Sequence, residues 1–159
     1  ILKKVRNCFC IQFYEKHRSI LPFLRLSFVL IRKGKEILLV HTRNFRSTFH
    51  GLVAGFLETG KTLEQCVERE VMEETGLHVR NIRYYKSQPW GIANDILAGF
   101  YCEVDGDPTI QMDTSELKYA QWVKRENIIL QPDDASLTNE MMQKFRDGEI
   151  RNINHVNAF

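Results

Sequence analysis

The sequence predicts one domain of mixed structure, of the α/β or α+β class. Segments rich in β-branched and aromatic residues are interspersed with two amphipathic segments, and short turns separate consecutive strands. The chain has 159 residues, of which 43% are hydrophobic and 26% are charged, which is enough for one hydrophobic core. A mixed β-sheet with helices packed on it is therefore the expected architecture.

The first predicted element is a β-hairpin. Residues 23–31 (FLRLSFVLI) and 36–41 (EILLVH) are strand-like and flank the turn-like RKGK. Residues 1–22 are basic and have no clear periodicity, so we expect a peripheral arm or the remnant of a missing upstream element. The domain itself is expected to cover residues 23–159.

A helix is predicted over residues 63–75. Thr62 and Gln65 form a capping-box pattern at its start, and Gly76 is a typical stop. The Gly-containing segment 50–61 leads into this helix. Further along the chain we expect strands at 79–88, 96–104 and 119–124, a turn at 105–109 and an amphipathic helix at 136–145.

Composition gives no support for several classes of partner. The formal net charge of +2 gives no support for nucleic-acid or membrane binding from bulk charge. No apolar run approaches the roughly 20 residues that span a bilayer, and the pattern of a signal peptide is missing, so we expect a cytoplasmic protein without membrane contact. Cys8 and Cys10 lack the spacing of a zinc-binding pair, so no structural zinc is expected within this chain.

The predicted helix carries an unusual cluster of glutamates near its C-terminal end. On a helical wheel with Leu63 at zero, Glu70, Glu73 and Glu74 fall at about 340°, 280° and 20°, on the side of the apolar stripe. A solvated helix end is the ordinary explanation of such a charge run. However, carboxylates near a helix C-terminus oppose the helix dipole, and Glu70 repels Glu74 at spacing i, i+4. A divalent cation, Mg²⁺ or Mn²⁺, would compensate this repulsion.

Residues 55–77, GFLETGKTLEQCVEREVMEETGL, resemble the Nudix box. That pattern is Gly, five residues, Glu, seven residues, then Arg-Glu-aliphatic-x-Glu-Glu-x-Gly-aliphatic. Every defined position matches except the first Glu, where this chain has Lys61. The resemblance implies a Nudix-type α/β/α sandwich, with a mixed β-sheet between helices.

The resemblance also implies a metal-dependent hydrolase of nucleoside diphosphate linkages. By position, Glu70 and Glu74 match the main metal ligands, and Glu73 matches an additional ligand or a group that orients water. Arg69 is expected to orient these carboxylates. The remaining metal ligands implied by the family are Glu116, which lies before a predicted strand, and the backbone carbonyl of Ala54.

A second stretch, SQPW at residues 87–90, resembles the motif that follows the Nudix box in the NADH pyrophosphatase subfamily. By this resemblance the substrate-binding residues are Phe56, Gln88, Pro89, Trp90 and Asp95. An aromatic ring such as that of Trp90 can stack on a base, although a place in the core is an equal alternative. The subfamily carries a zinc ribbon upstream, which here is absent or precedes Ile1.

Two classes of function stay open from the sequence. The first is a pyrophosphatase that splits NADH or NAD⁺ into two mononucleotides, with ADP-ribose, nucleotide sugars or other nucleoside diphosphate derivatives as alternative substrates. The second is a catalytically weak nucleotide-binding module, because the ammonium of Lys61 is expected to repel a cation. The expected partner is a small nucleotide; nucleic acid is not required, and the subfamily suggests a possible homodimer.

Overall fold

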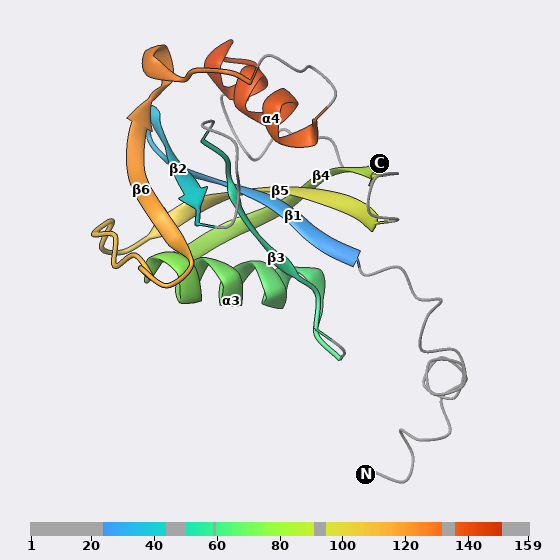
Figure 1. Cartoon of the computed structure of the whole chain (residues 1–159). Helices are drawn as coiled ribbons and strands as arrows, with labels where there is room; N and C mark the ends of the chain where they lie inside the picture. The colour runs from blue at the N-terminus through green and yellow to red at the C-terminus, as the bar shows by residue number, and fades with distance from the viewer. Residues whose placement is uncertain (1–23, 44–49, 59, 91–94, 132–135, 151–159) are drawn as a thin grey trace, which may run out of the picture.

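The computed structural model describes residues 24–43, 50–58, 60–90, 95–131 and 136–150 (Figure 1). The predicted arm over residues 1–22, with Cys8 and Cys10, lies outside these ranges. The elements are, in order, β1 (Leu24–Lys33), β2 (Glu36–Thr42), β3 (Val53–Phe56), α3 (Leu63–Thr75), β4 (His78–Trp90), β5 (Asp95–Asp105), β6 (Leu117–Lys124), the 3₁₀ helix η1 (Arg125–Asn127) and α4 (Leu137–Arg146).

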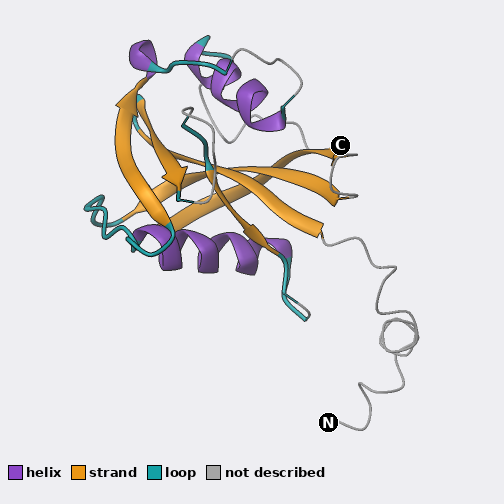
Figure 2. Ribbon diagram, in the orientation of Figure 1, coloured by secondary structure: helices purple, strands orange, loops and turns teal. Residues whose placement is uncertain are grey.

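The strands form one six-stranded mixed sheet. Its order is β4-β5-β1-β2-β6, with β3 paired to β1 off this path. The pairing of β1 with β5 is parallel, and the other pairings are antiparallel. Helix α3 covers one face of the sheet and α4 covers the other (Figures 1 and 2). The predicted sandwich with a mixed sheet between helices is confirmed.

Two hydrophobic cores fill the space between the sheet and the helices. Alternate residues of a strand point to opposite faces, so Val29 and Ile31 of β1 enter one core and Leu30 enters the other. On the first face these side chains pack with Val67 and Val71 of α3. The second core contains Leu137, Met141, Met142 and Phe145 of α4. The α3 core therefore fixes the depth and rotation of the glutamate helix.

The predicted hairpin and the predicted ends of α3 are confirmed. Arg32 pairs with Ile37 in the β1–β2 hairpin. At the start of α3, the Thr62 side chain accepts a hydrogen bond from the Gln65 backbone, and the Gln65 side chain accepts one from the Thr62 backbone. Gly76 ends the helix in the left-handed conformation, with φ of 68°. Local sequence therefore determines where α3 begins and ends.

Strand β3 is not among the elements that the sequence predicts, since residues 50–61 are expected only as a Gly-containing connection. Its Gly55 pairs with Leu26, and its Phe56 pairs with Arg25. A four-residue strand that contains a glycine is too short to show a period-two pattern. Tertiary pairing with β1, rather than local propensity, therefore creates this strand.

Among the described residues, no helix has the length and apolar character needed to cross a bilayer.

We predict that Gly76→Ala lowers the free energy of unfolding by about 1–3 kcal/mol, because a non-glycine residue is strained at positive φ. A Cβ at position 76 would also lie 2.8 Å from Gln111 Cβ. Gly106, with φ of 75° and open space around its Cα, is the matched control. Chemical denaturation should show a larger loss for Gly76→Ala than for Gly106→Ala, and equal losses would contradict the contact with Gln111.

Candidate active site

The carboxylate of Glu70 lies directly on the backbone of β3. The Phe56 N–H donates a hydrogen bond to Glu70 Oε1 at 3.2 Å. A Cβ built on Gly55 would lie 1.9 Å from Glu70 Cδ, so no side chain fits at position 55 in this arrangement. Glycine is required here for close approach, which explains its position at the start of the Nudix-like motif.

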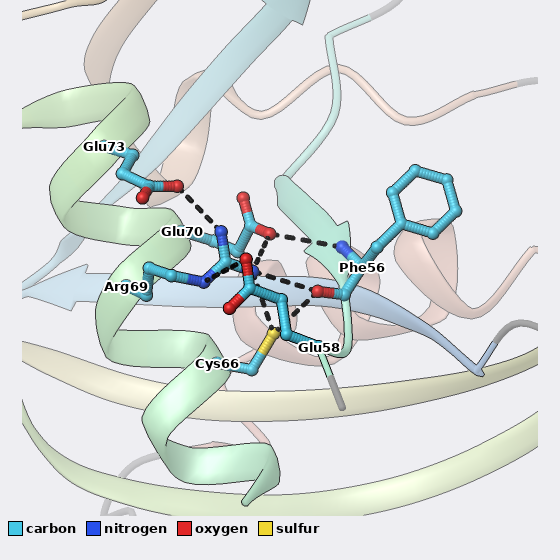
Figure 3. Close-up of polar contacts among 6 residues, drawn as sticks. All are labelled: Phe56, Glu58, Cys66, Arg69, Glu70 and Glu73. Carbon is cyan, nitrogen blue, oxygen red and sulfur yellow. Dashed lines mark hydrogen bonds and ion pairs between the residues drawn. The ribbon is translucent and has the colours of Figure 1, made fainter. Parts of the chain in front are cut away.

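The guanidinium of Arg69 contacts the Glu70 carboxylate and three neighbouring residues (Figure 3). Its Nη2 donates to Glu70 Oε1 at 2.6 Å and to the Phe56 carbonyl at 2.9 Å. Its Nη1 donates to Glu73 Oε2 at 2.7 Å, and Nε lies 3.8 Å from Glu58 Oε1. The guanidinium therefore bridges α3 and the end of β3, and it holds Glu70 in one orientation.

Glu74 lies at the centre of a group of negative charges. The pKa of Glu74 is raised to about 8, first by burial and then by the nearby charges of Glu70, Glu116, Asp113 and Glu73, in that order of effect. Within the described part of the chain, Arg69 pairs with Glu70 and Glu73, but no cation pairs with Glu74. A buried carboxylate among like charges favours either a bound proton or a bound cation.

The predicted inward direction of Glu73 is wrong. Its side chain is 59% exposed, whereas Glu70 and Glu74 are buried. Glu73 lies at the edge of the apolar stripe, and its contact with Arg69 keeps it at the surface. Thr75, the last residue of the helix, is fully buried, and its hydroxyl donates to the Val71 carbonyl at 2.6 Å. A helical wheel therefore does not decide whether a residue at the edge of the apolar stripe is buried or exposed.

The other predicted metal-binding residues lie at the edge of this group. Glu116 is exposed, and its backbone carbonyl accepts a hydrogen bond from the Arg43 N–H. Ala54 is exposed in β3, next to Gly55. Over the described residues, no three His, Cys, Asp or Glu side chains are arranged to hold a metal ion. The mutual repulsion at Glu74 and the all-oxygen character of the group nevertheless fit a hard divalent cation.

The predicted substrate residues lie on three strands, β3, β4 and β5, of which β4 and β5 pair with each other and β3 pairs with β1. Phe56 is 50% exposed at the end of β3. At the ends of β4 and β5, Pro89 pairs with Ile96, Trp90 pairs with Asp95, and Gln88 pairs with Leu97. The side chains of Trp90 and Asp95 lie outside the described part of the structure, so their contacts with a substrate stay predictions.

Three further residues belong to the site but were not assigned to it from the sequence. Glu58 lies beside Arg69, and Asp113 lies near Glu74. Cys66 donates its thiol hydrogen to the Phe56 carbonyl at 3.0 Å. Burial raises the pKa of this thiol. Glu58 and Cys66 fall within the 55–77 motif, at positions that the motif leaves undefined, so no sequence signal marked them.

Lys61, which departs from the motif, is exposed in the turn before α3. Its backbone N–H donates to the Glu58 carbonyl at 3.2 Å. Arg69, rather than Lys61, is the cation in contact with Glu70. Because solvent screens an exposed ammonium, its repulsion of a cation at the carboxylates is expected to be smaller than the sequence alone implied.

Curated relatives of this chain are named as hydrolases. The NAD-capped RNA hydrolase NudC of Vibrio parahaemolyticus is 46% identical over 94 residues, which make up 59% of this chain and 36% of that protein. The protein of the same name from Klebsiella pneumoniae is 40% identical over 116 residues, which make up 72% of this chain and 44% of that protein. The chain therefore spans less than half the length of these relatives.

Solved structures show the same fold. A NUDIX hydrolase from Nitrosomonas europaea matches with a TM-score of 0.70 at 16% identity, covering 82% of this chain and 73% of that chain. An ADP-ribose pyrophosphatase from Streptococcus suis matches with a TM-score of 0.63 at 20% identity, covering 82% and 93%. The NUDIX domain profile matches residues 23–145. Since this match covers most of the sequence, the chain belongs to the NUDIX family.

Proposed function

We propose that this chain is a divalent-metal-dependent hydrolase that splits the pyrophosphate bond of a NAD-type dinucleotide. The observation that carries the proposal is the group of carboxylates around Glu74, in which Glu70 lies against Gly55 and Arg69 at the positions of the Nudix-like motif. Mg²⁺ and Mn²⁺ are the proposed ions, because both accept carboxylate ligands and bind phosphate oxygens.

In this proposal Glu70 and Glu74 would hold the ion, and Glu116, Glu73 and the Ala54 carbonyl, which lie at the edge of the group, would complete its ligands when it binds. A bound ion would neutralise diphosphate charge and acidify water. Arg69 keeps Glu70 in place through the 2.6 Å contact, so the carboxylate does not have to be ordered when substrate binds. Glu73 and Glu116 are exposed to solvent and are the candidate groups that orient water or accept its proton.

The proposed substrate is the dinucleotide unit that free NAD(H) and NAD-capped RNA have in common. The names of the relatives support this choice, and so does the SQPW stretch at the end of β4. The exposed ring of Phe56 is a candidate to stack on a base or on nicotinamide. ADP-ribose and nucleotide sugars are the alternatives to be compared in the same screen. A homodimer, a cytoplasmic location and the lack of structural zinc stay predictions of the sequence.

We predict that the chain releases two mononucleotides from NADH in Mg²⁺ or Mn²⁺, and that Glu74→Gln lowers this turnover by at least about a hundredfold. Product-resolved chromatography of NADH, NAD⁺, NAD-capped RNA, ADP-ribose and nucleotide sugars is the assay. Glu68→Gln, on the exposed side of the same helix, is the control and should keep normal turnover. Binding without turnover of any substrate would favour the alternative, a nucleotide-binding module.

A second prediction concerns the pH dependence of the metal-free protein. The pKa of Glu74 is raised from its ordinary value of 4.5 to about 8, so the folded state holds this proton more tightly than the unfolded state. The contribution of this bound proton to the free energy of unfolding is fully present below about pH 4.5, and it is lost as the pH rises toward about 8. Glu74→Gln stays neutral, so in EDTA it should gain stability over wild type with rising pH, on the order of 1 kcal/mol or more near pH 8.

Thermal unfolding of both proteins from pH 5 to pH 9 in EDTA measures this difference. Titrating groups that do not interact with Glu74 cancel because they are present in both proteins, whereas Glu70, Glu116, Asp113 and Glu73 are coupled to Glu74 and contribute to the measured difference. Parallel stability curves would show that Glu74 is not held in a repulsive environment.

A third prediction tests substrate choice at Trp90. If its ring stacks on a base, Trp90→Ala should raise KM for NADH about five- to 150-fold, and much less for a minimal diphosphate ester. Steady-state kinetics on both substrates give the ratio. An equal loss on both, with unchanged thermal unfolding, would assign Trp90 to packing or to support of the metal site.

A further inference from the structure

The thiol of Cys66 makes a polar contact with the end of β3, beside the proposed metal site. Cys66 Sγ donates to the Phe56 carbonyl oxygen at 3.0 Å, and Arg69 Nη2 donates to the same oxygen at 2.9 Å. Arg69 Nη2 also lies 3.5 Å from Cys66 Sγ. Figure 3 shows the three groups converging, with the thiol reaching Phe56 from one turn before Arg69 on α3. Two donors from the helix therefore hold one carbonyl.

This contact matters because Phe56 is the last residue of a four-residue strand. Side chains of α3 bind both polar ends of this residue: Glu70 accepts from its N–H, and Cys66 and Arg69 donate to its carbonyl. The position of the Glu70 carboxylate and the position of the Phe56 backbone are thus mutually dependent.

We propose that Cys66 is a positioning residue, which fixes the Phe56 peptide and through it the Glu70 carboxylate and the exposed Phe56 ring. This inference rests on the proposed hydrolytic function and adds a residue to that site. The thiol does not touch substrate or metal in this account. It acts by limiting the directions in which the end of β3 can move.

Arg69 alone does not make the thiol redundant. The guanidinium is also engaged by Glu70, Glu73 and Glu58, and its side chain is 25% exposed. Cys66 is 1% exposed, and its donated hydrogen bond goes to the Phe56 carbonyl. The thiol is therefore the more buried of the two donors, and removing it should loosen the carbonyl even while Arg69 remains.

The test compares Cys66→Ala and Cys66→Ser with Cys102→Ala. Cys102 is a matched control, because it is also fully buried but lies in β5 with its thiol 3.9 Å from the Leu30 carbonyl. For each protein, NMR measures hydrogen exchange at the Phe56 amide, and steady-state kinetics with NADH and Mg²⁺ separate kcat from KM. Hydrogen exchange at the Phe56 amide is measured in the metal-free protein, so this result does not depend on whether the protein hydrolyses NADH.

We expect Cys66→Ala to speed exchange at Phe56 and to lower kcat about three- to tenfold, the scale of one hydrogen bond. Cys66→Ser, which retains a donor, should recover kcat to within about twofold. Cys102→Ala should leave both quantities at wild-type values even if it lowers thermal stability. The two Cys66 variants therefore separate loss of the donor from loss of packing.

Equal exchange at Phe56 in Cys66→Ala and Cys102→Ala would overturn the proposal. Faster exchange with unchanged kcat would also overturn it, because the contact between Cys66 and the Phe56 carbonyl would then have no consequence for the reaction. A wild-type protein without turnover would contradict the proposed function instead, and the exchange result would still decide whether Cys66 fixes Phe56.

Discussion

The contact between the Glu70 carboxylate and the backbone of β3 is the interaction on which the whole site depends. It requires a glycine at position 55, because any Cβ there would occupy the place of the carboxylate. It also requires that α3 begin and end at fixed positions, which the capping box at Thr62 and the left-handed Gly76 ensure. The packing of Val67 and Val71 against the sheet then sets the rotation of the helix. The contact of the Glu70 carboxylate with the backbone at Gly55 therefore depends on β3, on α3 and on the core between α3 and the sheet.

The same geometry concentrates negative charge at the expense of stability. Glu74 is buried among Glu70, Glu116, Asp113 and Glu73, and its pKa is raised to about 8 for that reason. A helix designed only for stability would place apolar or neutral residues at these positions. Arg69 offsets part of the repulsion through Glu70 and Glu73 but does not pair with Glu74. Such local violations of the stability rules are expected where a protein binds a charged ligand.

Elements with strong local signals were predictable from the sequence. The hairpin, α3 with both of its caps, and α4 follow from periodicity, turn residues and capping residues. Strand β3 was not predictable, because its four residues are ordered by pairing with β1 rather than by their own propensity. The burial of Glu70 and Glu74 was predicted correctly, whereas Glu73 lies near the boundary of the stripe, where a contact with Arg69 decides its direction. Contacts such as that of Cys66 with Phe56 depend on the placement of β3 and could not be predicted without it.

We propose that a divalent cation replaces a proton at the group of carboxylates around Glu74. Calorimetric titration of the metal-free protein with Mn²⁺ at pH 7, in buffers of different ionisation enthalpy, tests it most directly. Since the pKa of Glu74 is about 8 without metal, binding should release on the order of one proton per ion, and less at pH 9. Binding without proton release at pH 7, or no saturable binding, would contradict the claim.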